Sequence, residues 1–317
     1  MRKELGKFKK LLVIGGTGFF GKSILDSFQR GRLEKYSITE IVVVARNITK
    51  FKDEYPELIN NNIQLILGDI GELNQIPYAD IIIHAASSTN KQDYINDDLN
   101  QKNNIEKATF NYCKLAKKNH TNSKIVYCSS GAVYGQQPPD IEKIREDFDF
   151  NSVKGLAAEK RNYAIGKRNS EESIIKLGVE GLSVSIARCF AFYGKYLPKD
   201  QHFAYGNFVG KAEKGEVVKV NAENPVYRSY MSADELVDSL IIIALNSDKS
   251  CPIYNVGSDK AILIHDLAKK IAAEYGVNCE MKEITELQNV DRYVPDTTKL
   301  KKLVENFKKI SYDKKYY

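Results

Sequence analysis

The sequence predicts an α/β protein with a doubly wound parallel sheet and a smaller, irregular C-terminal part. Over about the first 190 residues, short apolar runs rich in Val and Ile alternate with segments of helical length. Runs that are apolar on both faces are typical of parallel strands covered by helices. Beyond that point the alternation stops, and Tyr, Gly, Pro and Asn become frequent up to about residue 230.

The elements follow in order. The expected strands are KLLVIG at 10–15, IVVVA at 41–45, IQLILGD at 63–69, DIIIHAA at 80–86, KIVYCSS at 124–130 and LSVSIARC at 182–189, with helix-like stretches at 22–30, 101–118 and 156–177. Farther along, DELVDSLIIIAL at 234–245 has a helical pattern and CPIYNVG at 251–257 a strand-like one. We therefore expect a Rossmann domain over 1–188 with returning segments near 227–258, and a second domain mainly over 189–317.

Composition excludes several classes of protein. The chain has 317 residues, of which 43% are hydrophobic and 28% charged, with 20 Gly and 8 Pro, which is neither collagen-like nor disordered. No apolar run approaches the roughly 20 residues that span a bilayer. Of the net charge of +6, residues 1–10 carry +4 and residues 299–317 carry +5, so the body carries −3. Solvated basic ends explain this better than a nucleic-acid-binding face, so neither membrane nor nucleic acid is an expected partner.

Cysteine and histidine usage points to a cytoplasmic protein without a metal site. The five cysteines are odd in number and widely spaced, which fits no disulfide framework. The four histidines (His84, His120, His202 and His265) have no ligand spacing. The segment LLVIGGTGFFG at 11–21 imitates a secretory signal, but it is rich in Gly, runs into Lys22 and lacks a small-residue cleavage site.

The strongest local motif is GGTGFFG at 15–21, directly after the first expected strand and at the start of a helix. Missing side chains let the backbone turn sharply and approach a pyrophosphate, and the helix N-terminus favours the anion. The motif therefore predicts dinucleotide binding by the first domain.

The end of the second strand indicates which dinucleotide binds. NAD enzymes usually place a carboxylate there to accept from the ribose 2′-OH, whereas this chain has Ala45, Arg46 and Asn47. A guanidinium suits a 2′-phosphate. NADP(H) is therefore favoured, with NAD(H) as the alternative if Arg46 is merely a surface residue.

A Tyr-x-x-x-Lys motif, Tyr163 to Lys167, provides candidate proton-transfer groups. Residues four apart share one helical face, so the ammonium can lie near the phenol and favour its ionisation. Chance matches are expected in a chain with 19 Tyr, but only this one occurs. It follows Ser129-Ser130, at the end of an expected strand, by 33 residues.

This order of motifs resembles the extended short-chain dehydrogenase/reductases, specifically the NAD(P)-dependent sugar epimerase/dehydratase family, over nearly the whole chain. Asp69-Ile70, HAAS at 84–87 and CSSGAVYG at 128–135 carry the likeness further. Segments at His202, Arg228 and Val294 are most similar to reductases of 4-keto-6-deoxy sugar nucleotides, such as CDP-abequose synthase. The resemblance implies a nucleotide-sugar substrate and a homodimer.

The resemblance also implies roles for particular residues. Catalysis falls to Ser130, Tyr163 and Lys167. Cofactor contacts fall to Gly15, Thr17, Gly18, Phe19, Phe20, Gly21, Arg46, Asp69, Ile70, Ala85, Ala86, Ser87, Asn104, Tyr163 and Lys167. Substrate contacts fall to Ser129, Ser130, Gly131, Phe190, His202, Asn207 and Arg228. The segments starting at Arg188 and Tyr254 resemble those that build the nucleotide-sugar pocket.

Two positions directly after the catalytic hydroxyl residue depart from the family pattern. Sugar-nucleotide 4,6-dehydratases have an Asp-Glu pair directly after the catalytic hydroxyl residue, where this chain has Gly131 and Ala132. Neither can move a proton, so the favoured expectation is an NADPH-dependent C4-ketone reductase that makes a deoxyhexose donor for a surface polysaccharide. The alternatives are an NAD-dependent 4-epimerase that uses the same triad, and a non-catalytic NADP(H)-binding sensor or scaffold.

Overall fold

The six apolar runs form parallel strands of one sheet in the structure, a computed structural model that describes residues 9–87, 98–150, 158–201 and 203–313. The strands are β1 (Lys9–Ile14), β2 (Ile38–Ala45), β3 (Ile63–Leu67), β4 (Ile81–His84), β5 (Lys124–Ser130) and β6 (Ser183–Cys189). A seventh strand, β11 (Ile253–Val256), pairs with β6 at the sheet edge, giving the order β11-β6-β5-β4-β1-β2-β3. The expected doubly wound Rossmann sheet is therefore confirmed.

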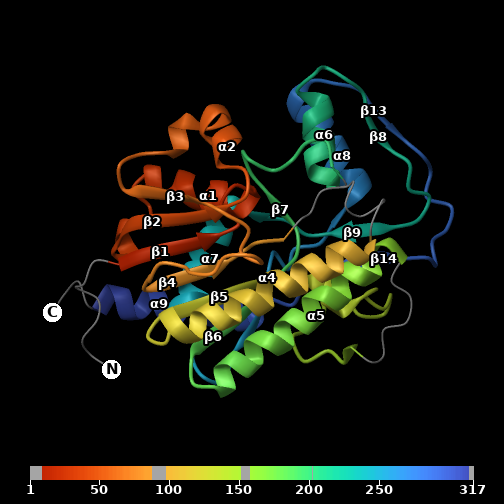
Figure 1. Ribbon diagram of the computed structural model, residues 1–317. Helices are drawn as coiled ribbons and strands as arrows, with labels where there is room; N and C mark the ends of the chain where they lie inside the picture. The colour runs from red at the N-terminus through yellow and green to blue at the C-terminus, as the bar shows by residue number, and fades with distance from the viewer. Residues whose placement is uncertain (1–8, 88–97, 151–157, 202, 314–317) are drawn as a thin grey trace.

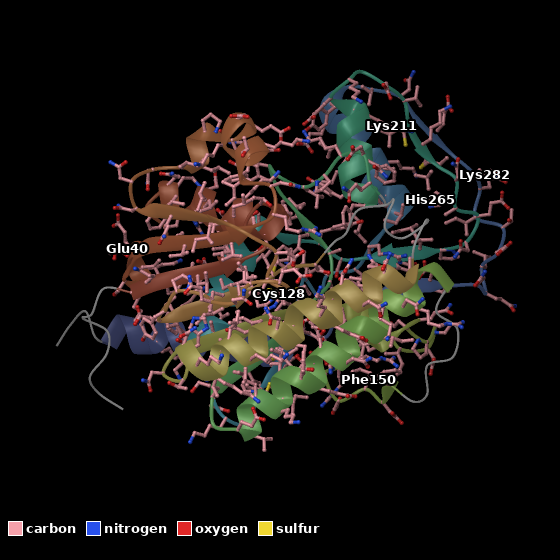
Figure 2. The ribbon with its side chains drawn as sticks, viewed as in Figure 1. Glu40, Cys128, Phe150, Lys211, His265 and Lys282 are labelled. Atoms are coloured by element: carbon pink, nitrogen blue, oxygen red, sulfur yellow. The ribbon has the colours of Figure 1, made fainter. Side chains whose placement is uncertain are left out.

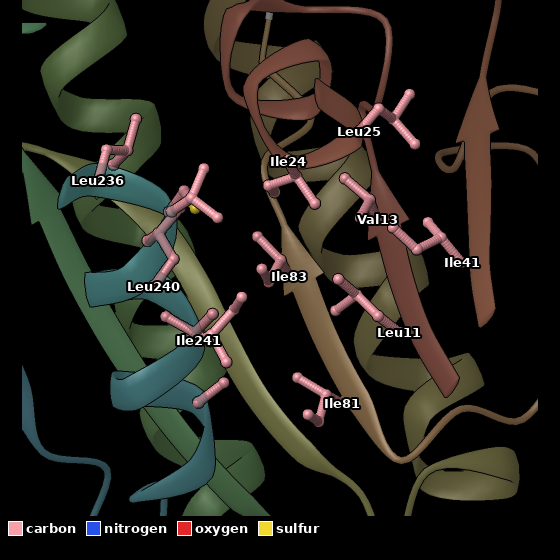
Figure 3. Close-up of a cluster of buried hydrophobic side chains, with 14 of the residues drawn as sticks. Leu11, Val13, Ile24, Leu25, Ile41, Ile81, Ile83, Leu236, Leu240 and Ile241 are labelled. Carbon is pink, nitrogen blue, oxygen red and sulfur yellow. The ribbon is translucent and has the colours of Figure 1, made fainter. Parts of the chain in front are cut away.

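Helices cover both faces of the sheet (Figure 1). On one face lie α4 (Asp98–Asn119) and α5 (Ala158–Val179), side by side. On the other lie α1 (Phe19–Gln29) and α7 (Ala233–Leu245), and α9 (Thr298–Asp313) packs on α7 and β11. Figure 3 shows side chains of α7 and α1 meeting those of β4 and β1 in the apolar core on this face of the sheet.

Helix α1 begins earlier than the pattern suggested, at Phe19 rather than near residue 22. The reason is that Gly18 already has extended backbone and acts as the N-cap, so the two phenylalanines start the helix instead of ending the loop. Both pack against the core on the α7 side of the sheet. The loop between β1 and α1 is consequently short.

The remaining elements complete the chain. Beside the sheet are α2 (Ile48–Glu54), β7 (Phe192–Tyr193), β10 (Met231–Ser232) and the 3-10 turns η1 (Glu34–Tyr36), η2 (Pro56–Leu58) and η3 (Gly131–Tyr134). A smaller lobe contains α6 (Ala204–Ala212), α8 (Ile264–Tyr275), β8 (Val218–Val220), β9 (Val226–Arg228), β12 (Ile262–Leu263), β13 (Cys279–Met281) and β14 (Asp291–Tyr293). It has its own apolar core between α6 and α8. Within the described ranges, no helix is both long and apolar enough to cross a membrane.

Candidate active site

A cavity of about 1520 Å³ lies between the carboxyl ends of the strands and the smaller lobe. Ligands of open α/β sheets bind at this end, where the strand order reverses between β1 and β4. Figure 2 shows Cys128 of β5 near the centre of the molecule, whereas Lys211, His265 and Lys282 belong to the smaller lobe. The volume exceeds the roughly 300–1,000 Å³ of an ordinary small-molecule pocket, so two ligands can share it.

The glycine-rich loop forms one wall of this cavity, and its glycines differ in purpose. Gly15 has φ +88°, and a Cβ there would lie 2.7 Å from the Ala86 backbone. A Cβ on Gly21 would overlap the Gly16 backbone, so Gly21 permits close packing of α1 on the loop and does not line the cavity. These two positions require glycine for reasons internal to the fold.

Gly18 is the glycine that leaves room for a ligand. A Cβ there would meet no atom closer than 3.6 Å, so packing within the protein does not exclude a side chain. Gly18 lines the cavity at the start of α1, where backbone N–H groups are not used by the helix. An anion can therefore approach the bare backbone, which fits the pyrophosphate of a dinucleotide.

Arg46 follows the last residue of β2 and lines the edge of the cavity. Its side chain is 62% exposed, and its guanidinium lies 3.9 Å from the Asp69 carboxylate. Asp69 accepts a hydrogen bond from the Gly71 N–H, at 2.8 Å, which holds the turn after β3. The Arg46 side chain is thus positioned at the cavity edge and remains available to a ligand phosphate.

Ser130, Tyr163 and Lys167 line one part of the cavity. Ser130 ends β5 and accepts a hydrogen bond from the Ala132 N–H, at 3.2 Å. On α5, Lys167 Nζ lies 5.9 Å from the centre of the Tyr163 ring and donates to the Cys128 carbonyl at 2.9 Å. The structure therefore brings together the hydroxyl, the phenol and the ammonium that the motifs selected.

Lys167 is buried, with 2% of its surface exposed, yet it stays charged. Burial lowers the pKa of Lys167, but Tyr127, Tyr163 and Cys128 more than offset this, so the pKa lies above its ordinary value. His84, fully buried at the end of β4, has a pKa lowered to about 3 by burial and by Lys167. Lys167 is thus a permanent positive charge next to a neutral imidazole.

Gly131 does not line the cavity, because side chains of the smaller lobe and of the segment after β6 cover it. A Cβ at Gly131 would lie 2.6 Å from the phenol oxygen of Tyr293 and 2.8 Å from the Phe190 ring. Phe190 and Tyr293 do line the cavity. Position 131 therefore has no space for an acidic side chain while Tyr293 and Phe190 keep these positions.

Of the other residues expected to contact cofactor or substrate, most line the cavity and a few do not. Thr17, Phe19, Phe20, Ile70, Ala85, Ala86, Ser87, Asn104, Ser129 and Arg228 line the cavity. Arg228 pairs with Asp291 at 2.6 Å, so part of its charge is neutralised. Asn207 lies on α6 away from the cavity lining, and His202 lies outside the described residues. Lining residues that the motifs did not indicate include Tyr293, Gln136 and Ile264.

The two segments expected to build the nucleotide-sugar pocket differ: Cys189, Phe190, Ala191 and Phe192 line the cavity, whereas Arg188 and residues 254–257 do not. Arg188 does not reach the cavity but forms a buried ion pair with Glu171, at 2.7 Å, in which both side chains are 4% exposed. It also donates to Tyr134, whose phenol donates to Asn255 at 2.7 Å. These side chains form a polar network behind the cavity wall and do not form part of the wall.

Fold and site together define a dinucleotide-binding enzyme of the short-chain dehydrogenase/reductase type, with a glycine-rich loop after the first strand and a Tyr-x-x-x-Lys pair at the cavity. Residues 11–257 match the description "NAD dependent epimerase/dehydratase family". The chain therefore belongs to that family of enzymes.

Relatives and solved structures agree with this assignment. UDP-glucuronic acid decarboxylase 1 of Xenopus tropicalis is 27% identical over 301 residues, covering 93% of this chain and 68% of that protein. UDP-N-acetyl-alpha-D-glucosaminuronate decarboxylase of Bacillus cytotoxicus is 23% identical, covering 96% and 94%. The UDP-N-acetylglucosamine 4-epimerase structure from Methanobrevibacter ruminantium has a TM-score of 0.75 at 18% identity, covering 94% of this chain and 92% of that one.

A double mutant of the dTDP-glucose 4,6-dehydratase DesIV from Streptomyces venezuelae, solved with NAD and DAU bound, has a TM-score of 0.73 at 19% identity. The match covers 92% of this chain and 89% of the DesIV chain. At these identities the two solved structures establish a shared fold.

Proposed function

We propose that this chain reduces the C4 ketone of a 4-keto-6-deoxy sugar nucleotide with NADPH, in the cytoplasm, making a deoxyhexose donor for a surface polysaccharide. The observation that carries the proposal is at the end of β5, where Gly131 and Ala132 bear no ionisable group and Tyr293 fills the space above Gly131. Removing water across C5–C6 needs an acid and a base at the sugar. A site with these groups missing, and with the Ser-Tyr-Lys constellation retained, is suited to reduction.

The same residues suggest how the chain would act. The loop at Gly15 and Gly18 and the Arg46 side chain would hold the dinucleotide, whose nicotinamide supplies a hydride when bound. Tyr163 would donate a proton to the C4 oxygen, and Ser130 would donate a hydrogen bond to the same oxygen as charge develops. Lys167, anchored on the Cys128 carbonyl, would hold the nicotinamide ribose and place its positive charge near the Tyr163 oxygen as that oxygen gives up its proton.

Products and cofactor measured together test this proposal. With NADPH and a panel of 4-keto-6-deoxy sugar nucleotides, we expect stoichiometric loss of reduced cofactor and a C4 alcohol. With a 6-hydroxylated sugar nucleotide we expect no dehydration.

A dehydrated product from purified protein would contradict the proposal. Interconversion of two C4 alcohols without net cofactor loss would instead identify a 4-epimerase, the class to which one structural neighbour belongs by name. Binding of NADPH with no turnover of any sugar nucleotide would favour a sensor or scaffold.

Cofactor preference depends on Arg46. A charge-assisted hydrogen bond to a 2′-phosphate contributes about 1.5–3 kcal/mol, so Arg46→Asp should weaken NADPH binding by about ten- to a hundred-fold. NADH binding should change little, because NADH lacks that phosphate. Fluorescence titration of both cofactors measures this, with the exposed Arg145→Asp as the charge-matched control. Equal NADPH affinity in Arg46→Asp and the parent would show that Arg46 does not contact the phosphate.

A homodimer through α4 and α5 is the assembly that we expect. Among the side chains of these helices whose burial is described, three large apolar ones are exposed: Phe110 (57%), Ile175 (38%) and Val179 (81%). Covering them with a second copy of the same helices would remove apolar surface from water on both subunits. Light scattering should give twice the monomer mass, and Phe110→Asp should shift the protein toward monomer. A monomeric parent protein at micromolar concentration would contradict this assembly.

A further inference from the structure

Two cysteine thiols meet at the wall of the cavity, next to Ser130. Cys128 lies on β5, two residues before Ser130, and Cys189 ends β6, where the strand register places it opposite Ser130. Both residues are almost fully covered, with 4% and 5% of their surfaces exposed, and both line the cavity. All five cysteines of the chain are free thiols. The proposed reduction uses neither of these two side chains.

The two side chains lie on the same face of the sheet and contact each other. Cys128 is paired with Ala187, two residues before Cys189, and all three belong to the core that α1 and α7 cover. The Cys189 thiol donates to the Ala187 carbonyl at 3.6 Å and shares a hydrogen bond with the Cys128 thiol. A ligand that enters the cavity therefore meets a pair of thiols.

The spacing of the two strands does not suit a disulfide between these thiols. Neighbouring strands lie about 4.8 Å apart, and two residues advance a parallel strand by about 6.6 Å. The Cα atoms of Cys128 and Cys189, as diagonal neighbours, are therefore about 8 Å apart. A disulfide needs Cα atoms closer than about 7 Å. Since both strands lie inside the sheet, with partners on each side, they cannot easily move together.

A single ion between the two sulfur atoms fits this spacing better. With a metal–sulfur bond of about 2.3 Å on either side, the sulfur atoms can be up to about 4.6 Å apart. Zinc in structural sites takes four ligands, whereas the described residues contain no group of three or more His, Cys, Asp or Glu able to hold a metal. Thiolates select Cu(I), and the closed-shell ions Cu(I) and Ag(I) are stable with only two thiolate ligands.

The charge of Lys167 also favours such a complex. Binding of one monovalent cation to two thiolates releases two protons and leaves a net charge of −1. Lys167 donates to the Cys128 carbonyl at 2.9 Å and interacts electrostatically with both thiols. A buried positive charge is therefore already in place to compensate a buried negative complex.

We propose that Cys128 and Cys189 form a two-coordinate site for a soft monovalent cation of the Cu(I) and Ag(I) class. The ligands come from different strands, 61 positions apart, so cysteine spacing in the sequence did not indicate them. A bound ion would lie next to Ser130 and block that part of the cavity. Such a site depends neither on the identity of the sugar nucleotide nor on the reaction that the chain catalyses.

Anaerobic competition for Cu(I) against the chelator bicinchoninate tests this site. The reduced parent protein should take up one Cu(I) per chain, and X-ray absorption at the copper edge should show two sulfur neighbours. Cys128→Ala and Cys189→Ala should each lower Cu(I) affinity at least about a hundred-fold, because each removes a ligand, and changes around a ligand alone already cost 10–100-fold. Cys113→Ala and Cys251→Ala are the matched controls, since both thiols are buried in the other core and do not line the cavity.

Copper uptake by the parent and the four variants decides whether the site exists. Uptake that is lost in both cavity variants and kept within about two-fold in both controls supports it. No uptake by the parent, or uptake unchanged in Cys128→Ala and Cys189→Ala, would overturn it. Nitrogen or more than two sulfur neighbours at the copper would also overturn it, and that measurement needs only the parent protein. Since no sugar nucleotide is used, the site and the proposed function fail independently.

Discussion

Tyr163→Phe should lower kcat by about 10² to 10⁴ while NADPH affinity is largely retained, the range typical of a lost general acid. The substitution keeps the ring beside the charged Lys167 and removes the phenol group that would give a proton to the C4 oxygen. Lys167 keeps its bond to the Cys128 carbonyl, so the local fold should not change.

Single-turnover kinetics, with the surface variant Tyr275→Phe as control, measures this loss directly. Because chemistry is then observed apart from product release, a loss confined to the chemical step identifies the acid. Activity within a few-fold of the parent would remove Tyr163 from the mechanism and favour a non-catalytic role for the dinucleotide site.

Arg188→Met should destabilise the fold by about 3–5 kcal/mol, because it leaves the Glu171 carboxylate buried without its partner. The pair is close, at 2.7 Å, and both side chains are almost fully covered. The substitution also removes the donor to Tyr134, at 2.9 Å, so a second buried polar group loses a bond. Urea unfolding gives the change in free energy, with m-values checked for constancy.

Two further variants make this prediction sharp. Arg145→Met breaks an ion pair of the same kind at an exposed site, so it should change stability little. Arg188→Met combined with Glu171→Leu should recover much of the loss, because no unpaired charge then remains buried. A small loss in Arg188→Met, with no recovery in the double variant, would contradict the account of this network.

Much of the sheet was predictable because its strands are covered on both faces. Buried parallel strands need continuous apolar runs, and each expected run became a strand of the sheet. The glycine-rich loop was equally predictable from the sequence, because Gly15 has a positive φ and Gly21 packs closely on Gly16. Both requirements concern residues close together in the chain, so the local sequence pattern indicates them.

The direction of individual strand side chains was less predictable. Successive residues of a strand point to opposite faces, and the register sets Ser130 opposite Cys189. Cys189 therefore reaches the cavity and Arg188 lies behind it, in contact with α5. With both faces of the sheet buried, no apolar-polar alternation in the sequence marks which face a residue takes.

Tyr293 was beyond sequence reasoning for a different reason. It contacts the space above Gly131 from 162 positions later in the chain. No spacing links the two positions, because the link depends on how β14 pairs with β9 and how the following backbone bonds to Gln137. The absence of a side chain at Gly131 was visible, whereas the residue that fills the space was not.

Transfer of deuterium from [4,4-²H₂]NADPH to the sugar tests the central claim most directly. Incubation of the protein with this cofactor and a 4-keto-6-deoxy sugar nucleotide should give a C4 alcohol that carries deuterium at C4, with oxidised cofactor formed in equal amount. Mass spectrometry and proton NMR locate the label. A C4 alcohol without deuterium, or labelled cofactor left unconsumed while sugars interconvert, would contradict net reduction by this chain.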